Sequence, residues 1–130
     1  MIVVVAAVIE RDGSFLVTRR LEGTHLAGMW EFPGGKIGSG ETHAQALVRE
    51  IREELDADVD VGALLFETQF DYAERRVLLH FYRCTLRGEP KALLGQEMKW
   101  VPRADLRALD FPPADADLIR LLLESLPDKL

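Results

Sequence analysis

The chain has 130 residues, of which 48% are hydrophobic and 29% charged, and its formal net charge at pH 7 is −6. This length is typical of one domain with its own hydrophobic core, and the composition excludes an intrinsically disordered chain. The acidic balance, with no Lys/Arg-rich block, argues against stable binding of duplex DNA or RNA. Cys84 is the only cysteine, which excludes an internal disulfide and a cysteine-rich zinc site.

The amino-terminal part of the chain predicts two strands and a long loop. Residues 2–10 form a β-branched run that is too short to span a bilayer and has no signal-peptide flanks, so we expect a buried strand in a soluble, cytoplasmic protein. Residues 11–14 have turn chemistry and residues 15–19 resume a strand, which predicts a hairpin. Residues 21–41 hold six glycines and predict a long, functional loop around a short strand near 29–33.

A helix is predicted over residues 42–55. Thr42 with Gln45 three residues on is a capping box. Aliphatic side chains at four-residue spacing form its apolar stripe: Leu47, Ile51 and Leu55.

The rest of the chain predicts further strands and a second helix. The strands fall at 58–69, 76–85 and 97–102, with a turn over 71–75 and a short helical turn at 103–109. The final helix runs from about 115 to 126 after two prolines, and leucines lie on one side of it: Leu118, Leu122 and Leu126. The whole chain, 1–130, is thus one domain of the α/β or α+β class, a mixed sheet covered by helices.

The first predicted helix carries three carboxylates related by three- and four-residue spacing, Glu50, Glu53 and Glu54. A solvated surface helix is the alternative interpretation. The repulsion between Glu50 and Glu54 and the glycine-rich loop just before the helix favour a metal site instead. Oxygen ligands on a rigid helix suit Mg²⁺ or Mn²⁺, so the chemistry indicated is metal-assisted attack on a phosphate ester or anhydride.

The spacing of these residues resembles the Nudix box, G-x5-E-x7-R-E-U-x-E-E-x-G-U. The matching residues are Gly35, Glu41, Arg49, Glu50, Ile51, Glu53 and Glu54. The departures are Asp56 and Ala57, where the pattern has a glycine and an aliphatic residue. Asp can adopt the left-handed conformation at a cost of about 1 kcal/mol, so the departure concerns the helix end and hardly the metal site.

Segments 18–20, 28–36 and 111–115 resemble the MutT-like branch of the family, which includes 8-oxo-dGTP diphosphatases and CTP pyrophosphohydrolases. The resemblance implies an α/β/α sandwich with a mixed central sheet. It also implies hydrolysis of a nucleoside triphosphate to the monophosphate and pyrophosphate. The expected role of this reaction is sanitisation of the nucleotide pool. The cofactor would be Mg²⁺, which Mn²⁺ can replace, and the protein a monomer or small homodimer.

The resemblance also assigns catalytic roles. The expected metal ligands are Glu50, Glu53, Glu54, the Gly34 carbonyl and, as an additional ligand, Glu97. Arg49 would orient a helix carboxylate. Glu41 would brace the loop. We favour Glu50 over Glu97 as the general base.

Substrate contacts are expected from residues outside the helix. Arg20 and Lys36 are candidates for the phosphates, and His25 falls where the branch has a histidine near the substrate. The base would meet four further residues: Glu31, Phe32, Tyr72 and Arg75.

Asp115 stands where the MutT prototype has an asparagine that reads the oxidised purine. Its alternative role is an ordinary helix N-cap. An ionised Asp only accepts hydrogen bonds, whereas Asn also donates, so the substitution weakens the case for 8-oxo-dGTP. A protonated, buried Asp would restore the donor.

Three functions compete on this evidence. The leading hypothesis is an enzyme that hydrolyses oxidised or noncanonical (d)NTPs. The alternatives are another Nudix substrate, such as (d)CTP, 5-methyl-dCTP, ADP-ribose or a nucleotide sugar, and a non-catalytic binding module. The intact glutamate set disfavours the last.

Overall fold

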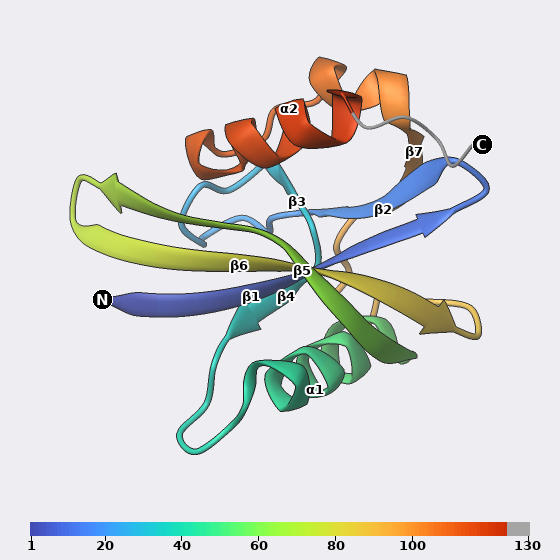
Figure 1. Ribbon diagram of the computed structural model, residues 1–130, viewed down its shortest axis with the longest axis horizontal. Helices are drawn as coiled ribbons and strands as arrows, with labels where there is room; N and C mark the ends of the chain where they lie inside the picture. The colour runs from blue at the N-terminus through green and yellow to red at the C-terminus, as the bar shows by residue number, and fades with distance from the viewer. Residues whose placement is uncertain (125–130) are drawn as a thin grey trace.

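The computed structural model describes residues 1–124 and shows three layers (Figure 1). Helix α1 (His43–Leu55) covers one face of the sheet. Helix α2 (Ala116–Glu124) covers the other face, together with the short 3₁₀ helices η1 (Arg103–Ala108) and η2 (Pro113–Asp115). This arrangement confirms the expected α/β/α sandwich. No helix within the described part of the chain is long and apolar enough to cross a membrane.

The central sheet is mixed. Its strands are β1 (Ile2–Arg11), β2 (Ser14–Arg19), β3 (Trp30–Glu31), β4 (Gly34–Lys36), β5 (Asp58–Tyr72), β6 (Arg75–Arg87) and β7 (Met98–Pro102). The main order is β3-β2-β1-β6-β5, with β4 paired to β1 and β7 paired to β2. Only the β1–β6 pair is parallel among the pairings described, and the other pairs are antiparallel.

Strand β1 changes partner along its length. Residues Ile2 to Ile9 pair with β6 on one edge, and Val4 to Ala6 also pair with β4 on the other, where Val5 lies opposite Gly35. Its last residues, Glu10 and Arg11, pair with β2 as the predicted hairpin requires. The glycine-rich segment therefore enters the sheet beside β1, where it contacts α1.

Several predicted boundaries were wrong. The short strand predicted near 29–33 is present as β3, but a second strand in the loop, Gly34–Lys36, was missed, because it pairs with β1 although its glycines give no strand signal. The β5–β6 hairpin is longer than expected, and its turn is only residues 73–74. Near the turn the two strands remain paired, but most of their side chains are exposed. The hydrophobic pattern in the sequence therefore ends before the strands do. Helix α2 begins at Ala116. Leu126, which was predicted to lie on its leucine side, falls outside the described residues.

The ends of α1 match the sequence-based expectation. The Thr42 hydroxyl accepts from the Gln45 N–H at 3.1 Å, and the Gln45 side chain accepts from the Thr42 N–H at 2.9 Å, which confirms the capping box. Asp56 ends the helix in the left-handed conformation, with φ 52°, and donates its N–H to the Arg52 carbonyl at 3.1 Å. The helix thus ends as a Nudix glycine would end it, but with strain that glycine avoids.

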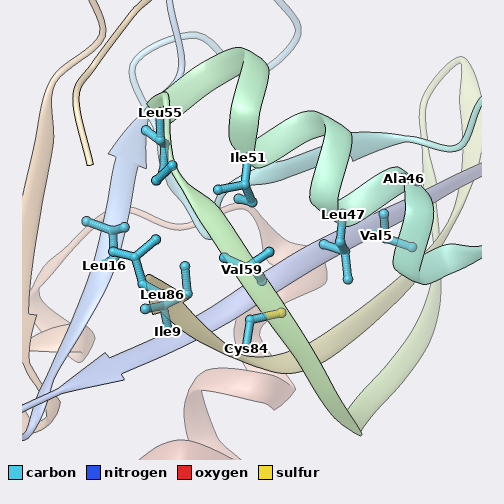
Figure 2. Close-up of a cluster of buried hydrophobic side chains, with 12 residues drawn as sticks. Val5, Ile9, Leu16, Ala46, Leu47, Ile51, Leu55, Val59, Cys84 and Leu86 are labelled. Atoms are coloured by element: carbon cyan, nitrogen blue, oxygen red, sulfur yellow. The ribbon is translucent and has the colours of Figure 1, made fainter. Parts of the chain in front are cut away.

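The apolar stripe of α1 is fully buried (Figure 2). Leu47, Ile51 and Leu55 pack on the sheet against side chains that include Val5 and Leu16. Burial of each such side chain stabilises the fold by roughly 1.5–3 kcal/mol. The core thereby holds the carboxylates of α1 on a fixed support. A second core, built around Phe15, Phe81 and Leu118, lies between the sheet and α2.

Candidate active site

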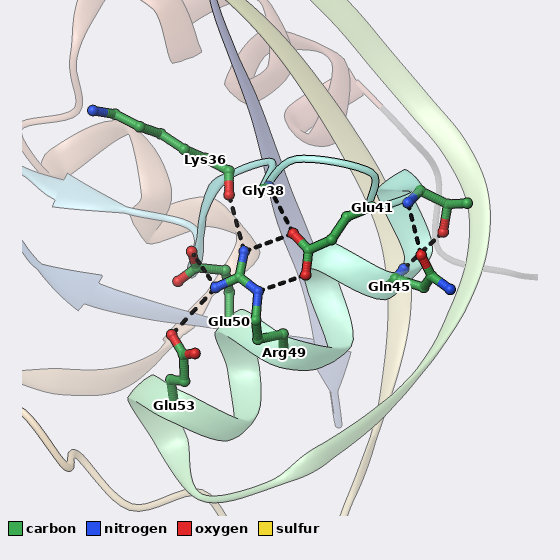
Figure 3. A network of polar contacts seen from close by, with 8 residues as sticks. Lys36, Gly38, Glu41, Gln45, Arg49, Glu50 and Glu53 are labelled. Carbon is green, nitrogen blue, oxygen red and sulfur yellow. Dashed lines mark hydrogen bonds and ion pairs between the residues drawn. The ribbon is translucent and has the colours of Figure 1, made fainter.

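Arg49 is the centre of a polar network between the glycine-rich loop and α1 (Figure 3). Its Nε and Nη2 donate to the two carboxylate oxygens of Glu41, at 2.6 and 2.9 Å. Its Nη2 also donates to the Lys36 carbonyl at 3.1 Å. Glu41 in turn accepts from the Gly38 N–H at 2.7 Å. The hydrogen bonds from Arg49 and Gly38 lower the pKa of Glu41 to about 2. Glu41 therefore braces the loop, as expected.

The same guanidinium reaches two carboxylates of the helix. Arg49 Nη1 donates to Glu50 at 3.2 Å and to Glu53 at 3.3 Å (Figure 3). Hydrogen bonds and nearby negative charge from Glu41 and Glu50 raise the pKa of Arg49 above its usual value. The residue is thus held ionised in a fixed orientation, and it fixes the carboxylates that it contacts.

Glu50 and Glu54 lie side by side on the part of α1 that faces β4. Burial raises the pKa of Glu54 to about 9, with further contributions from a hydrogen bond to Glu50 and the negative charge of Glu50. The approach of Glu50 to the loop depends on Gly35, because a Cβ at that position would lie 2.4 Å from the Glu50 carboxylate. A Cβ at Gly34 would lie 2.0 Å from the Val5 carbonyl oxygen. Position 34 therefore requires glycine, whereas a side chain at position 35 would displace the Glu50 carboxylate.

The donor set fits a hard divalent cation. Glu50 and Glu54 offer adjacent carboxylate oxygens, and a cation between them would offset the repulsion that raises the pKa of Glu54. Within residues 1–124, no three His, Cys, Asp or Glu side chains already converge around one point as ligands. Glu53 is 59% exposed and shares Nη1 of Arg49 with Glu50.

A pocket of about 370 Å³ opens next to Glu54, a volume in the range of small-molecule sites. Strand β6 contributes three apolar side chains at two-residue spacing to its lining, Val77, Leu79 and Phe81. Most of the residues expected at the site line this pocket: Arg20, His25, Glu31, Phe32, Gly34, Lys36, Glu54, Tyr72, Arg75 and Asp115. They come from the glycine-rich loop and its short strands, the β5–β6 hairpin, α1 and η2.

Asp115 is a buried pocket residue, so its interpretation as a helix N-cap was wrong. It is 5% exposed and lies inside η2, whose cap is Pro112. Burial and the charge of Glu31 raise the pKa of Asp115 to about 7, against the opposing effect of Arg20. Burial also raises the pKa of Glu31, and its contact with Arg20 counteracts that rise. Both carboxyls line the pocket together with Glu54, and Glu31 has an ion pair with Arg20 at 2.8 Å.

Arg20 forms hydrogen bonds with two other residues of the pocket wall. Its Nη1 donates to Glu31 at 2.8 Å and its Nε to the His25 carbonyl at 2.5 Å. His25 contacts Tyr72 edge-to-face, with ring centroids 4.9 Å apart, and so joins the loop to the β5–β6 hairpin. Burial and the charge of Arg75 lower the pKa of His25. Phe32 stacks on Phe111 with centroids 5.5 Å apart, which fixes its ring in the pocket.

Glu97 directly precedes β7 and is paired with Arg19. It is 62% exposed, and the ion pair has a length of 2.8 Å. Like Glu50, Glu53 and Arg49, it does not line the pocket. The structure therefore brings Glu54 and the base-pocket residues together but does not bring Glu97 to them.

Sequence reasoning missed several pocket residues. Thr18 and Gln96 are buried polar side chains that line it, and Leu94 lines it while 53% exposed. A signal existed for Gln96, since it stands next to Glu97 in the segment already considered. Thr18 gave none, because a threonine within a strand is ordinary.

A rigid helix with adjacent carboxylates beside a pocket of nucleotide size is the arrangement expected of a hydrolase that acts on phosphoric anhydrides. The model of the NUDIX domain matches residues 4–121. The chain therefore belongs to the Nudix family.

Similar proteins agree with this assignment. The chain is 44% identical over 126 residues to the 8-oxo-dGTP diphosphatase of Haemophilus influenzae, covering 95% of this chain and 92% of the relative. It is 40% identical over 119 residues to the CTP pyrophosphohydrolase of Escherichia coli, covering 91% and 87%. The solution structure of the E. coli ORF135 protein superimposes with a TM-score of 0.80 at 39% identity, covering 94% of this chain and 86% of that one.

Proposed function

We propose that this chain is a cytoplasmic, Mg²⁺-dependent Nudix hydrolase that converts oxidised or noncanonical nucleoside triphosphates, such as 8-oxo-dGTP, to the monophosphate and pyrophosphate. The observation that carries the proposal is the position of Glu54. It is paired with Glu50 on the helix and also lines the pocket that contains Phe32 and Asp115. The 44% identity to an 8-oxo-dGTP diphosphatase supports the substrate class.

Glu50, Glu53, Glu54 and the Gly34 carbonyl would hold the metal, with Glu97 a further candidate. When bound, the metal would neutralise the polyphosphate and make water a stronger nucleophile. Mn²⁺ has the same preference for oxygen ligands and would replace Mg²⁺. The structure fits this donor set through the adjacent Glu50 and Glu54 carboxyls.

The protein's own residues would do the rest. Glu50, oriented by Arg49, would accept the proton of the attacking water. Lys36 would bind phosphate oxygens at the pocket wall, and Arg75 would contact the base. Arg20 has two nitrogens already bound to Glu31 and His25, so it would fix the wall as well as attract phosphate.

The base would lie at the part of the pocket wall that Phe32 and Tyr72 line, where the half-buried Tyr72 accepts any base by stacking. Asp115 would then read the base edge. In its protonated form the carboxyl has a donor and an acceptor, as the asparagine amide does, and the raised pKa of about 7 makes this form available near neutral pH.

The same property of Asp115 favours a second candidate, a (d)CTP or 5-methyl-dCTP pyrophosphohydrolase. Cytosine presents an N4 amino donor and a ring-nitrogen acceptor next to each other, and a protonated carboxyl complements both. The 40% identity to a CTP pyrophosphohydrolase also supports this substrate.

A substrate screen tests the proposal. Pyrophosphate release would be measured with 8-oxo-dGTP, dGTP, dCTP, CTP and 5-methyl-dCTP, and AMP release with ADP-ribose, each with Mg²⁺ and with Mn²⁺. We expect turnover of 8-oxo-dGTP, of the cytidine nucleotides, or of both. Hydrolysis of ADP-ribose alone would contradict the proposal.

The Glu53→Gln variant tests whether any turnover depends on the expected metal ligands of α1. It removes one expected metal ligand from an exposed position and leaves the core untouched. We expect turnover to fall about 100-fold or more while the melting temperature stays close to that of the wild type. Unchanged turnover would exclude Glu53 as a ligand.

A further inference from the structure

The carboxyl end of α1 is completed by a distant segment of the chain. The last carbonyls of a helix lack partners within the helix. Here the Lys91 N–H donates to the Leu55 carbonyl at 2.7 Å, and the Leu93 N–H donates to the Glu54 carbonyl at 3.0 Å. Segment 91–96, which lies between β6 and β7, therefore caps the end of the helix that carries Glu54.

Gln96 adds the side-chain part of this cap. Its Nε2 donates to the Glu54 carbonyl at 3.3 Å, and its Oε1 accepts from the Leu94 N–H at 2.9 Å. Gln96 is only 8% exposed, so both bonds lie in a partly desolvated environment where an unmade bond costs more. A primary amide is the side-chain group that offers a donor and an acceptor together at fixed geometry.

The two groups that Gln96 joins both belong to the pocket. Glu54 stands on the side of the carboxylate pair, Leu94 lines the wall while 53% exposed, and Gln96 lies in the lining between them. The next residue along the chain is fixed too, since the Glu97 carbonyl accepts from the Arg19 N–H at 2.9 Å. A change at Gln96 would therefore move the backbone of a carboxylate residue and the pocket wall together.

We infer that Gln96 is a positioning residue for hydrolysis, which holds the Glu54 backbone at the distance from the pocket wall that metal binding and turnover require. The inference rests on the proposed function for its activity readout. It concerns how Glu54 is held, through its backbone carbonyl, and not which groups bind the metal. Gln96 itself contacts no reacting atom in this account.

The opposite end of the same helix offers a matched control. Gln45 also uses its side-chain amide to bind a backbone group at a helix end, the Thr42 N–H at 2.9 Å. It is exposed and does not line the pocket beside Glu54. Gln96→Met and Gln45→Met therefore remove the same chemical group from the two ends of α1, one near the pocket and one far from it.

The experiment measures three quantities for each variant: the melting temperature, the Mn²⁺ dissociation constant from the electron paramagnetic resonance signal of free Mn²⁺, and kcat and KM for pyrophosphate release. We expect Gln96→Met to weaken Mn²⁺ binding and to lower kcat, each about 10-fold, with a smaller change in KM. Gln45→Met lowers the melting temperature but leaves the Mn²⁺ dissociation constant and kcat unchanged.

Gln96→Glu is the second variant, in case Gln96→Met does not fold. It keeps the acceptor for the Leu94 N–H but loses the donor to the Glu54 carbonyl and adds negative charge there. We expect kcat to fall at an assay temperature where the melting temperature shows that the variant is still folded. Equal kcat and Mn²⁺ affinity in the Gln96 variants and Gln45→Met would overturn the inference. If the wild type releases no pyrophosphate, yet Gln96→Met alone weakens Mn²⁺ binding, the proposed function fails and the role of Gln96 stands.

Discussion

The two sides of the pocket hold their charged groups by different physical means. On the α1 side, Arg49 contacts three carboxylates next to the pocket, Glu41, Glu50 and Glu53, although burial also raises the pKa of Glu54, which lines the pocket. On the η2 side, Asp115 is buried and its pKa is controlled mainly by desolvation. The first side suits a reaction that needs fixed charges. The second suits substrate recognition that depends on whether Asp115 is protonated or ionised.

This difference predicts that chemistry and recognition can be changed separately. Variants on the α1 side should lower turnover of all substrates alike. Variants on the η2 side should change the ratio between substrates. The experiments below test that separation, from the largest expected effect to the smallest.

Glu54→Gln tests the point where the two sides meet. Because Glu54 belongs to the carboxylate pair and also lines the pocket, we expect kcat to fall by about 10²–10³-fold, the size found when one preorganised charged group is removed. The fall is measured with 8-oxo-dGTP and dCTP in parallel. A loss confined to one of the two nucleotides would break the proposed separation.

Arg49→Lys tests the charge network. Lysine keeps the positive charge but cannot bond both oxygens of Glu41 and also reach Glu50. We expect kcat to fall about 10–100-fold, equally for all substrates. Steady-state kinetics with circular dichroism as a folding control measure this. A folded variant with wild-type kcat would mean that the network orients nothing that the reaction uses.

Asp115→Asn tests the recognition side through pH. The pKa of Asp115 is raised to about 7, so the protonated form, which can donate, is present below pH 7 and is lost as pH rises through that value. We expect kcat/KM of the wild type for a substrate that needs the donor to fall across this range, relative to Asp115→Asn. The asparagine variant keeps its donor at every pH and, at pH 8, should favour such a substrate by about 10-fold, within the 1–3 kcal/mol of one bidentate base contact. Parallel pH profiles in the two proteins would exclude Asp115 as the titrating group.

Asp56→Gly is the smallest change and acts only on stability. The residue has φ 52°, a conformation that costs a non-glycine residue about 1 kcal/mol or more. We expect the melting temperature to rise by about 3–5 °C and kcat to stay constant. Differential scanning calorimetry gives the first quantity. A lower melting temperature would show that the Asp56 side chain stabilises the helix end in another way.

The sequence was most informative where function and local structure share one stretch of chain. The capping box at Thr42 and the buried stripe of α1 followed from residue spacing, because a helix maps sequence distance onto a face. The Nudix-box match correctly located the loop and the helix. The four-residue spacing of Arg49 and Glu53 allows their ion pair, but that Arg49 also reaches Glu41 and Glu50 depends on side-chain rotamers.

The pocket was harder to predict because its lining comes from segments far apart in the sequence. The burial of Asp115 follows from the packing of η2 against the sheet, and periodicity cannot distinguish that state from an exposed N-cap. Gln96 and Glu54 are 42 residues apart, and no local pattern joins them. The β4 strand was missed because its pairing with β1 comes from tertiary contact, whereas its glycines predict a loop.

The cap on α1 has a consequence for how the protein folds and opens. Since segment 91–96 supplies the hydrogen bonds at the helix end, the last turn of α1 cannot reach its native state until β6 and the following segment are in place. The amides of that turn should therefore exchange with solvent together with those of residues 91–96, as one cooperative unit. The amides near Thr42, whose cap is local, should behave independently. The catalytic end of the helix is then the part whose order depends most on the rest of the domain.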